Sequence, residues 1–131
     1  PHTVAPERTF WEKAMLLHEE TFREVNPKAR LARHYYDLWC LITKGVAAEA
    51  MQDDGLFERV AAHRRIFFRY GWMDYATLSK GRLRVLPLSE QEAEWRRDYE
   101  AMRGEMFSRT PPPFDAVLKT VAEFEKEFNR Q

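Results

Sequence analysis

Apolar side chains recur every three or four residues along most of the chain, which is the spacing of one face of an α-helix. The first such segment follows Thr9, which we expect to form a capping box with Glu12, and it ends before Pro27. Further segments of this kind span residues 30–44, 56–70, 90–109 and 114–128, and a short Ala-rich stretch covers residues 46–52. We therefore predict an all-α fold, a bundle of about five helices in a single domain of residues 1–131.

Residues 72–88 interrupt the helical pattern. They contain a Ser-Lys-Gly turn signal, and polar and apolar residues alternate from Arg82 to Val85. Alternation is typical of a strand and the turn residues favour a loop, so we expect one irregular loop or short strand here. In the helix before this segment, the spacing predicts an inner face made of Phe57, Val60, Ala61, Arg64, Phe67 and Phe68.

Composition places the chain among ordinary globular proteins, with 44% apolar and 32% charged residues. The 21 basic and 21 acidic residues cancel, so no overall field selects a partner. The single cysteine, Cys40, excludes an internal disulfide and fits a reducing cytoplasm. No apolar run approaches the roughly 18 residues of a membrane span. The four histidines are far apart and none pairs with a cysteine, so we expect no metal held by this chain.

Charge is nevertheless uneven along the chain. Between residues 59 and 84, Asp74 is the single acid against a run of arginines and lysines. Four of these arginines are candidates for contacts with phosphates of a nucleotide or nucleic acid: Arg59, Arg64, Arg65 and Arg69. The alternative is a solvated helix face on which arginine stems cover aromatic neighbours.

Asp37 lies within the most apolar run of the chain, RHYYDLWCL at residues 33–41. It could pair with Arg33 on a solvated face, a contact of at most about 0.5 kcal/mol. It could instead converge with Lys13 at a groove between the first two helices, where the lysine would hold a phosphate and Asp37 would orient it or a hydroxyl. In that case the neighbours His34, Tyr35 and Tyr36 would support the carboxylate.

These segments resemble the C-terminal helical part of the AbiEii/AbiGii nucleotidyltransferase toxins. The resemblance rests on TFWEKAMLLH at residues 9–18 and RHYYDL at 33–38, extended by HRRIFFRYGW at 63–72, LRVLP at 83–87 and DYEAMRGEMF at 98–107. It implies a lysine and an aspartate of the catalytic site at Lys13 and Asp37. It also implies a two-lobed enzyme of toxin–antitoxin or phage abortive-infection systems, which transfers a nucleotide from an NTP with Mg²⁺ to an acceptor such as tRNA.

One part of the family pattern is absent. The 131 residues contain neither the Gly-Ser nor the Asp-x-Asp motif that holds the metal ions in the other lobe. We therefore expect a C-terminal fragment of a larger nucleotidyltransferase, inactive alone and with no tightly bound cofactor. Its partners would be the missing N-terminal lobe and a cognate antitoxin.

Two further possibilities depend on what covers the aromatic residues of the first helix. If the missing lobe covers these residues in the complete enzyme, they are exposed in this chain alone. We then expect the chain to form a homodimer through Trp11, since an uncovered apolar patch usually finds a partner. The rival hypothesis is a free-standing α-helical interaction module without catalysis. A Gly-Ser and Asp-x-Asp segment upstream of residue 1 would favour the enzyme.

Overall fold

The computed structural model describes residues 5–23, 31–53, 55–106 and 110–130. These residues form six α-helices and one 3₁₀ turn: α1 (Pro6–Glu20), α2 (Arg33–Thr43), α3 (Val46–Gln52), α4 (Leu56–Phe67), η1 (Tyr75–Thr77), α5 (Glu92–Glu105) and α6 (Phe114–Arg130). The predicted all-α class is confirmed, and α3 is the Ala-rich stretch. In the described part of the chain, no helix is long and apolar enough to span a membrane.

Helix α1 begins four residues earlier than its apolar pattern suggests, at Pro6 rather than after Thr9. Pro6 occupies the first turn after Ala5, and no side chain caps the helix. Proline is favoured at this position because its fixed φ suits a helix and its missing N–H would have had no partner. The predicted capping box of Thr9 and Glu12 is therefore wrong.

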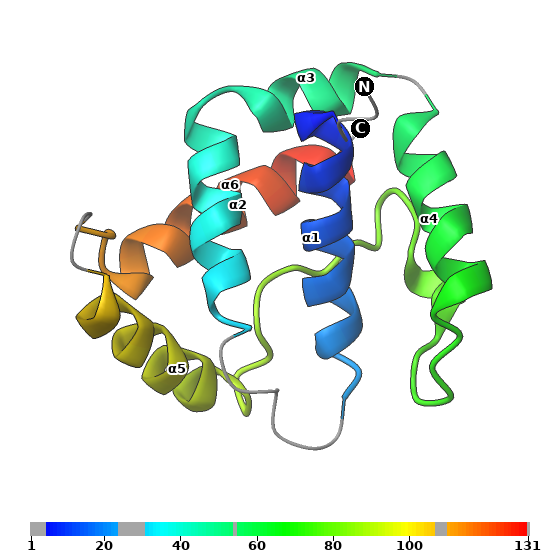
Figure 1. Cartoon of the computed structure of the whole chain (residues 1–131). Helices are drawn as coiled ribbons and strands as arrows, with labels where there is room; N and C mark the ends of the chain where they lie inside the picture. The colour runs from blue at the N-terminus through cyan, green and yellow to red at the C-terminus, as the bar shows by residue number, and fades with distance from the viewer. Residues whose placement is uncertain (1–4, 24–30, 54, 107–109, 131) are drawn as a thin grey trace.

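Helix α1 lies in the middle of the molecule and packs against α2, α3 and α4, while α6 crosses behind it and packs against α2 (Figure 1). The Trp11 ring is fully buried, and its Nε1–H donates to the Ala50 carbonyl at 3.4 Å. Aromatic rings surround it, namely Phe10, Phe57, Phe124 and Phe128. Because Trp11 is 0% exposed, the predicted dimer contact through this residue is wrong.

The segment between η1 and α5 passes behind α1 as an extended loop (Figure 1). Leu83 and Val85 enter the core while Arg82 and Arg84 stay exposed, as the alternation indicates, but no strand forms between residues 72 and 88. Side chains of α6 make the hydrogen bonds that a partner strand would otherwise make to this loop, because buried backbone groups need hydrogen-bond partners. The Asn129 amide bonds both backbone groups of Leu83, and Glu125 accepts the Val85 N–H at 2.6 Å.

The C-terminal end of α4 leaves the core earlier than predicted. Helix α4 ends at Phe67, and the backbone turns at Arg69, whose φ of 33° is left-handed. Phe67 is 69% exposed and Phe68 is 38% exposed, so their assignment to the inner face is wrong. Phe57, Val60, Ala61 and Arg64 are buried, as expected.

Candidate functional site

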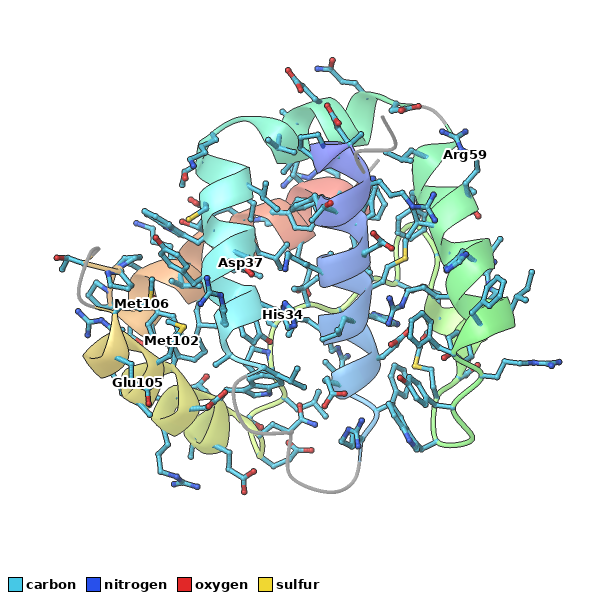
Figure 2. All side chains as sticks on the ribbon, viewed as in Figure 1. His34, Asp37, Arg59, Met102, Glu105 and Met106 are labelled. Carbon is cyan, nitrogen blue, oxygen red and sulfur yellow. The ribbon has the colours of Figure 1, made fainter. Side chains whose placement is uncertain are left out.

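Lys13 on α1 and Asp37 on α2 form an ion pair, with the lysine Nζ 2.9 Å from Oδ2 of the carboxylate. Phe10, Ala14 and Leu17 on α1 are drawn into the core, which leaves Lys13 on the flank that faces α2. Figure 2 shows Asp37 and His34 on the side of α2 that is turned toward α1. The two side chains are 23% and 24% exposed, so solvent and a ligand can reach the pair.

His34 is the second group that holds Lys13. Its Nδ1 lies 3.3 Å from the lysine Nζ and 4.0 Å from the Asp37 carboxylate. Burial, and then the positive charge of Lys13, lower the pKa of His34 below its ordinary value. The ring is therefore neutral at pH 7, and its Nδ1 lone pair accepts a hydrogen bond from the ammonium. An ammonium has three donors, so these two acceptors fix its direction and leave one donor for a ligand.

Lys13 and His34 line a hollow of about 260 Å³ together with Thr9, Glu12, Leu16 and Arg64. The hollow extends from α2 across α1 to α4. Lys13 supplies a cation with a free donor and Thr9 a hydroxyl, whereas the guanidinium of Arg64 is already engaged by Glu19. An anionic group that enters from solvent would meet Lys13 as the principal attractive charge.

Three residues expected to support the carboxylate lie elsewhere. The Tyr35 hydroxyl donates to the Val85 carbonyl at 2.6 Å, and its ring packs edge-on against Trp95, so its predicted place beside Asp37 is wrong. Tyr36 is buried and stacks on Trp39. Arg33 is exposed, and the described contacts of Asp37 are with Lys13 and His34 rather than with this arginine.

The four candidate arginines fall into two groups. Arg64 is 5% exposed and makes a two-pronged ion pair with Glu19, with N···O distances of 2.6 and 2.7 Å. It is a structural residue, and its predicted phosphate contact is wrong. Arg65 donates to the Leu78 carbonyl at 2.9 Å and is half-buried. Arg59 and Arg69 are exposed, and Figure 2 shows Arg59 near the start of α4.

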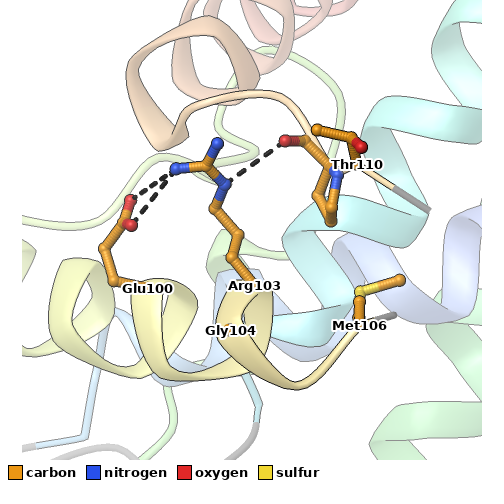
Figure 3. Close-up of a pocket in the computed structure, with 6 residues that line it drawn as sticks. Glu100, Arg103, Gly104, Met106 and Thr110 are labelled. Atoms are coloured by element: carbon orange, nitrogen blue, oxygen red, sulfur yellow. Dashed lines mark hydrogen bonds and ion pairs between the residues drawn. The ribbon is translucent and has the colours of Figure 1, made fainter. Parts of the chain in front are cut away.

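Two other hollows have less to offer a ligand. One, of about 400 Å³, lies beside His18, whose Nδ1 accepts the Arg84 N–H at 2.8 Å and whose Nε2 bonds the Thr77 hydroxyl at 2.9 Å. Both ring nitrogens are thus used inside the chain. The other, of about 360 Å³, lies beside Arg103, which is engaged by Glu100 and the Pro111 carbonyl (Figure 3). We assign no ligand to either.

The described residues do not fit Mg²⁺ by themselves. Within these ranges, no group of three or more His, Cys, Asp or Glu side chains is placed to hold a metal ion. The carboxylates at the candidate site are Glu12, which lines the hollow, and Asp37, which is paired with Lys13.

The helical bundle holds a lysine ammonium on a carboxylate and an imidazole at the edge of an open hollow, and this arrangement is a candidate site for an anionic ligand. Comparison with protein families gives this bundle a more definite identity. The family model described as "Nucleotidyl transferase AbiEii toxin, Type IV TA system" matches residues 1–120. The chain belongs to the AbiEii nucleotidyl transferase toxin family, which confirms the resemblance seen in its sequence. No curated protein and no solved structure matches it.

Sequence reasoning paired Lys13 with Asp37 but missed the direct contact of His34 with the ammonium. Helical spacing placed His34 near Asp37, three residues away. Whether the His34 ring also reaches Lys13 depends on how α1 and α2 pack. It also missed the Glu19–Arg64 pair, because the two residues are separated by 45 positions and no local pattern connects them. The available signal was Arg64, a charged residue on the predicted inner face of residues 56–70.

Proposed function

We propose that this chain is the helical lobe of an NTP-dependent nucleotidyltransferase toxin and that Lys13 binds a phosphate of the nucleotide. The observation that supports the proposal is the Lys13–Asp37 pair of 2.9 Å, open to solvent at the edge of a hollow. Membership of the AbiEii family supports the reaction class.

Lys13 acts in this proposal as a positioned point charge. Asp37 and His34 hold the ammonium from one side, so that its remaining donor is directed without the loss of side-chain freedom on binding. A lysine that is fixed before the nucleotide arrives stabilises charge on the phosphate during transfer better than a mobile one does.

The remaining parts of the reaction belong to other segments in this proposal. A second lobe supplies the Gly-Ser and Asp-x-Asp motifs that hold Mg²⁺, and the acceptor is a nucleic acid such as tRNA. The enzyme works in the cytoplasm, where a cognate antitoxin opposes it. Residues 1–131 alone bind NTP weakly, since one charge-assisted contact contributes about 1.5–3 kcal/mol, less than the roughly 4 kcal/mol of millimolar affinity.

The test is nucleotide transfer by the complete protein that contains this chain. The protein is incubated with each radiolabelled NTP, Mg²⁺ and total tRNA, and the label incorporated into RNA is measured. Lys13→Ala is expected to lower the rate by about 100-fold or more, because it removes a charge that stabilises the transition state. Arg33→Ala, an exposed cation on α2, is the matched control and should retain activity. Full activity of Lys13→Ala in a folded protein would refute the assignment.

One observation favours a rival function. The aromatic residues of α1 are buried by the chain's own helices, so these helices form a core without another lobe. That is the behaviour of a free-standing interaction module without catalysis. The reading frame upstream of residue 1 separates the two: Gly-Ser followed by Asp-x-Asp supports the enzyme, and a separate start codon supports the module.

A further inference from the structure

The end of α4 presents large apolar side chains to solvent. Ile66 is 63% exposed and Phe67 69%, and Phe68 and Tyr70 follow at 38% and 36%. We call these four residues the α4 aromatic surface. Other large apolar residues of the described helices are buried or half-buried, so this cluster is not the ordinary scatter of apolar groups on a protein surface.

The charged side chains within residues 65–70 are both positive, Arg65 and Arg69. Farther away, Arg59 is paired with Asp53 at 3.8 Å, Glu58 lies near the start of α4, and the Asp74 carboxylate accepts the Ala76 N–H. An occupant of this surface therefore needs negative charge as well as groups that contact aromatic rings.

The rings at this surface are arranged as two stacked pairs. His63 and Phe67 stack with their centroids 4.4 Å apart, and Tyr70 stacks on Trp72 at 4.7 Å with an angle of 10° between the rings. The left-handed backbone at Arg69 turns the chain between these pairs. Strained backbone of this kind persists where the surrounding structure needs it, often at binding surfaces. Flat, exposed rings beside arginines suit the stacking of nucleobases, whose phosphates the arginines neutralise.

The α4 aromatic surface also reaches the candidate nucleotide site. The Phe68 ring covers the Arg64 guanidinium at 4.1 Å, and Arg64 lines the same hollow as Lys13 and His34. The surface and the hollow therefore adjoin each other through Phe68 and Arg64.

We propose that the α4 aromatic surface binds a single-stranded segment of the nucleic-acid acceptor and presents its end to the Lys13 hollow. Bases stack on Phe67 and Tyr70, and the guanidinium of Arg69 contacts a phosphate. The idea rests on the proposed function for the identity of the acceptor, but binding of the strand requires no catalysis. The opposite charge of nucleic acid favours it over a second copy of this chain, whose own α4 surface would be equally basic.

The test measures fluorescence anisotropy of a labelled 12-nucleotide single-stranded RNA of mixed sequence with the complete protein. Phe67→Ala and Tyr70→Ala should each weaken binding about 10-fold, as loss of one base–aromatic stack does. Arg69→Gln keeps a polar side chain at this position and removes the positive charge. It should reduce the slope of log affinity against log salt by about 1. Trp39→Ala, a half-buried aromatic residue on α2, is the control and should leave RNA affinity unchanged.

The two proposals fail in different ways. Lys13→Ala should lower the transfer rate by about 100-fold or more while RNA affinity is kept. Phe67→Ala should raise the KM for RNA and leave the KM for NTP unchanged. If transfer survives in Lys13→Ala, the proposed function fails and the RNA-binding result still stands. Unchanged RNA affinity in both folded aromatic variants would overturn the inference. So would a concentration-dependent dimer in sedimentation that Phe67→Ala abolishes, because it assigns the surface to a second copy.

Discussion

At the scale of single residues, His18 and His34 show how similar pKa shifts serve different ends. Burial is the largest cause in both cases, and it lowers both pKa values below 6.5. His18 uses both ring nitrogens within the chain, where it joins α1 to the loop at Thr77 and Arg84. His34 lines the hollow beside Lys13, where its lone pair helps to hold an ammonium. The first ring is structural, and the second belongs to the site.

The buried His18 should make stability depend on pH. Its pKa is lowered from 6.5 to about 4, so between these values the unfolded chain binds a proton that the folded chain does not. The stabilisation is complete above pH 6.5 and is lost as the pH falls toward 4, by up to about 3 kcal/mol. Urea unfolding at pH 7.5 and pH 4.5 measures this difference.

The His18→Gln variant isolates this contribution from that of other groups. It should lose part of the difference in unfolding free energy between the two pH values, because the titrating group is gone. His63→Gln, at a half-exposed ring on α4, is the control and should keep the difference of the unmodified protein. Equal pH dependence in His18→Gln and the unmodified protein would contradict the prediction.

At the scale of elements, the Glu19–Arg64 pair joins α1 to α4 from inside the molecule. Both side chains are almost fully buried, at 3% and 6% exposure. Two short hydrogen bonds and the Phe68 ring satisfy the guanidinium, so the pair holds the two helices in one relative position. That position places Arg64 at the hollow and the α4 aromatic surface next to it.

Replacing one partner of the Glu19–Arg64 pair should lower the free energy of unfolding more than replacing both partners does. Arg64→Met leaves Glu19 as an unpaired buried charge, which we expect to lower the free energy of unfolding by about 3–5 kcal/mol. The double variant Glu19→Leu with Arg64→Met should recover most of this loss, because no charge is left buried. Chemical denaturation of both variants and of each single one gives the coupling. Arg59→Met, an exposed arginine of α4, is the control, and a loss below 1 kcal/mol in Arg64→Met would count against the prediction.

The elements also show where sequence reasoning holds and where it ends. The strong apolar repeats of α2, α5 and α6 predicted these helices, because their burial follows directly from spacing. The start of α1 was misread, since a capping-box pattern at Thr9 competed with Pro6, and the proline decided the backbone. Phe67 and Phe68 were misplaced because spacing alone does not reveal where a helix leaves the core. For the site, spacing put Lys13 and Asp37 on facing flanks, but the burial of Tyr35 depends on contacts with α5 and the loop.

At the scale of the whole molecule, one core draws side chains from all six described helices. The rings around Trp11 come from α1, α4 and α6, so this residue lies where distant parts of the chain meet. A change at this point affects the entire fold rather than one contact surface.

Trp11→Lys should therefore unfold the chain rather than alter its association. It removes a fully buried aromatic ring, at a cost of about 3–5 kcal/mol, and adds a charge without a partner. Circular dichroism and thermal unfolding measure the outcome. Phe67→Lys makes the same type of change at a 69% exposed position and should remain folded. A folded Trp11→Lys variant that differs only in its oligomeric state would show that the ring is not in the core.

The hydrogen bonds from α6 to the loop at Leu83 and Val85 have a consequence for the order of synthesis. The ribosome makes residues 114–130 after all the other described elements, yet Glu125 and Asn129 satisfy backbone groups near the centre of the molecule. Phe124 and Phe128 likewise complete the rings around Trp11. A nascent chain that stops short of Glu125 thus has an open core and an unsatisfied loop. The helices therefore complete their shared core only when translation has passed α6.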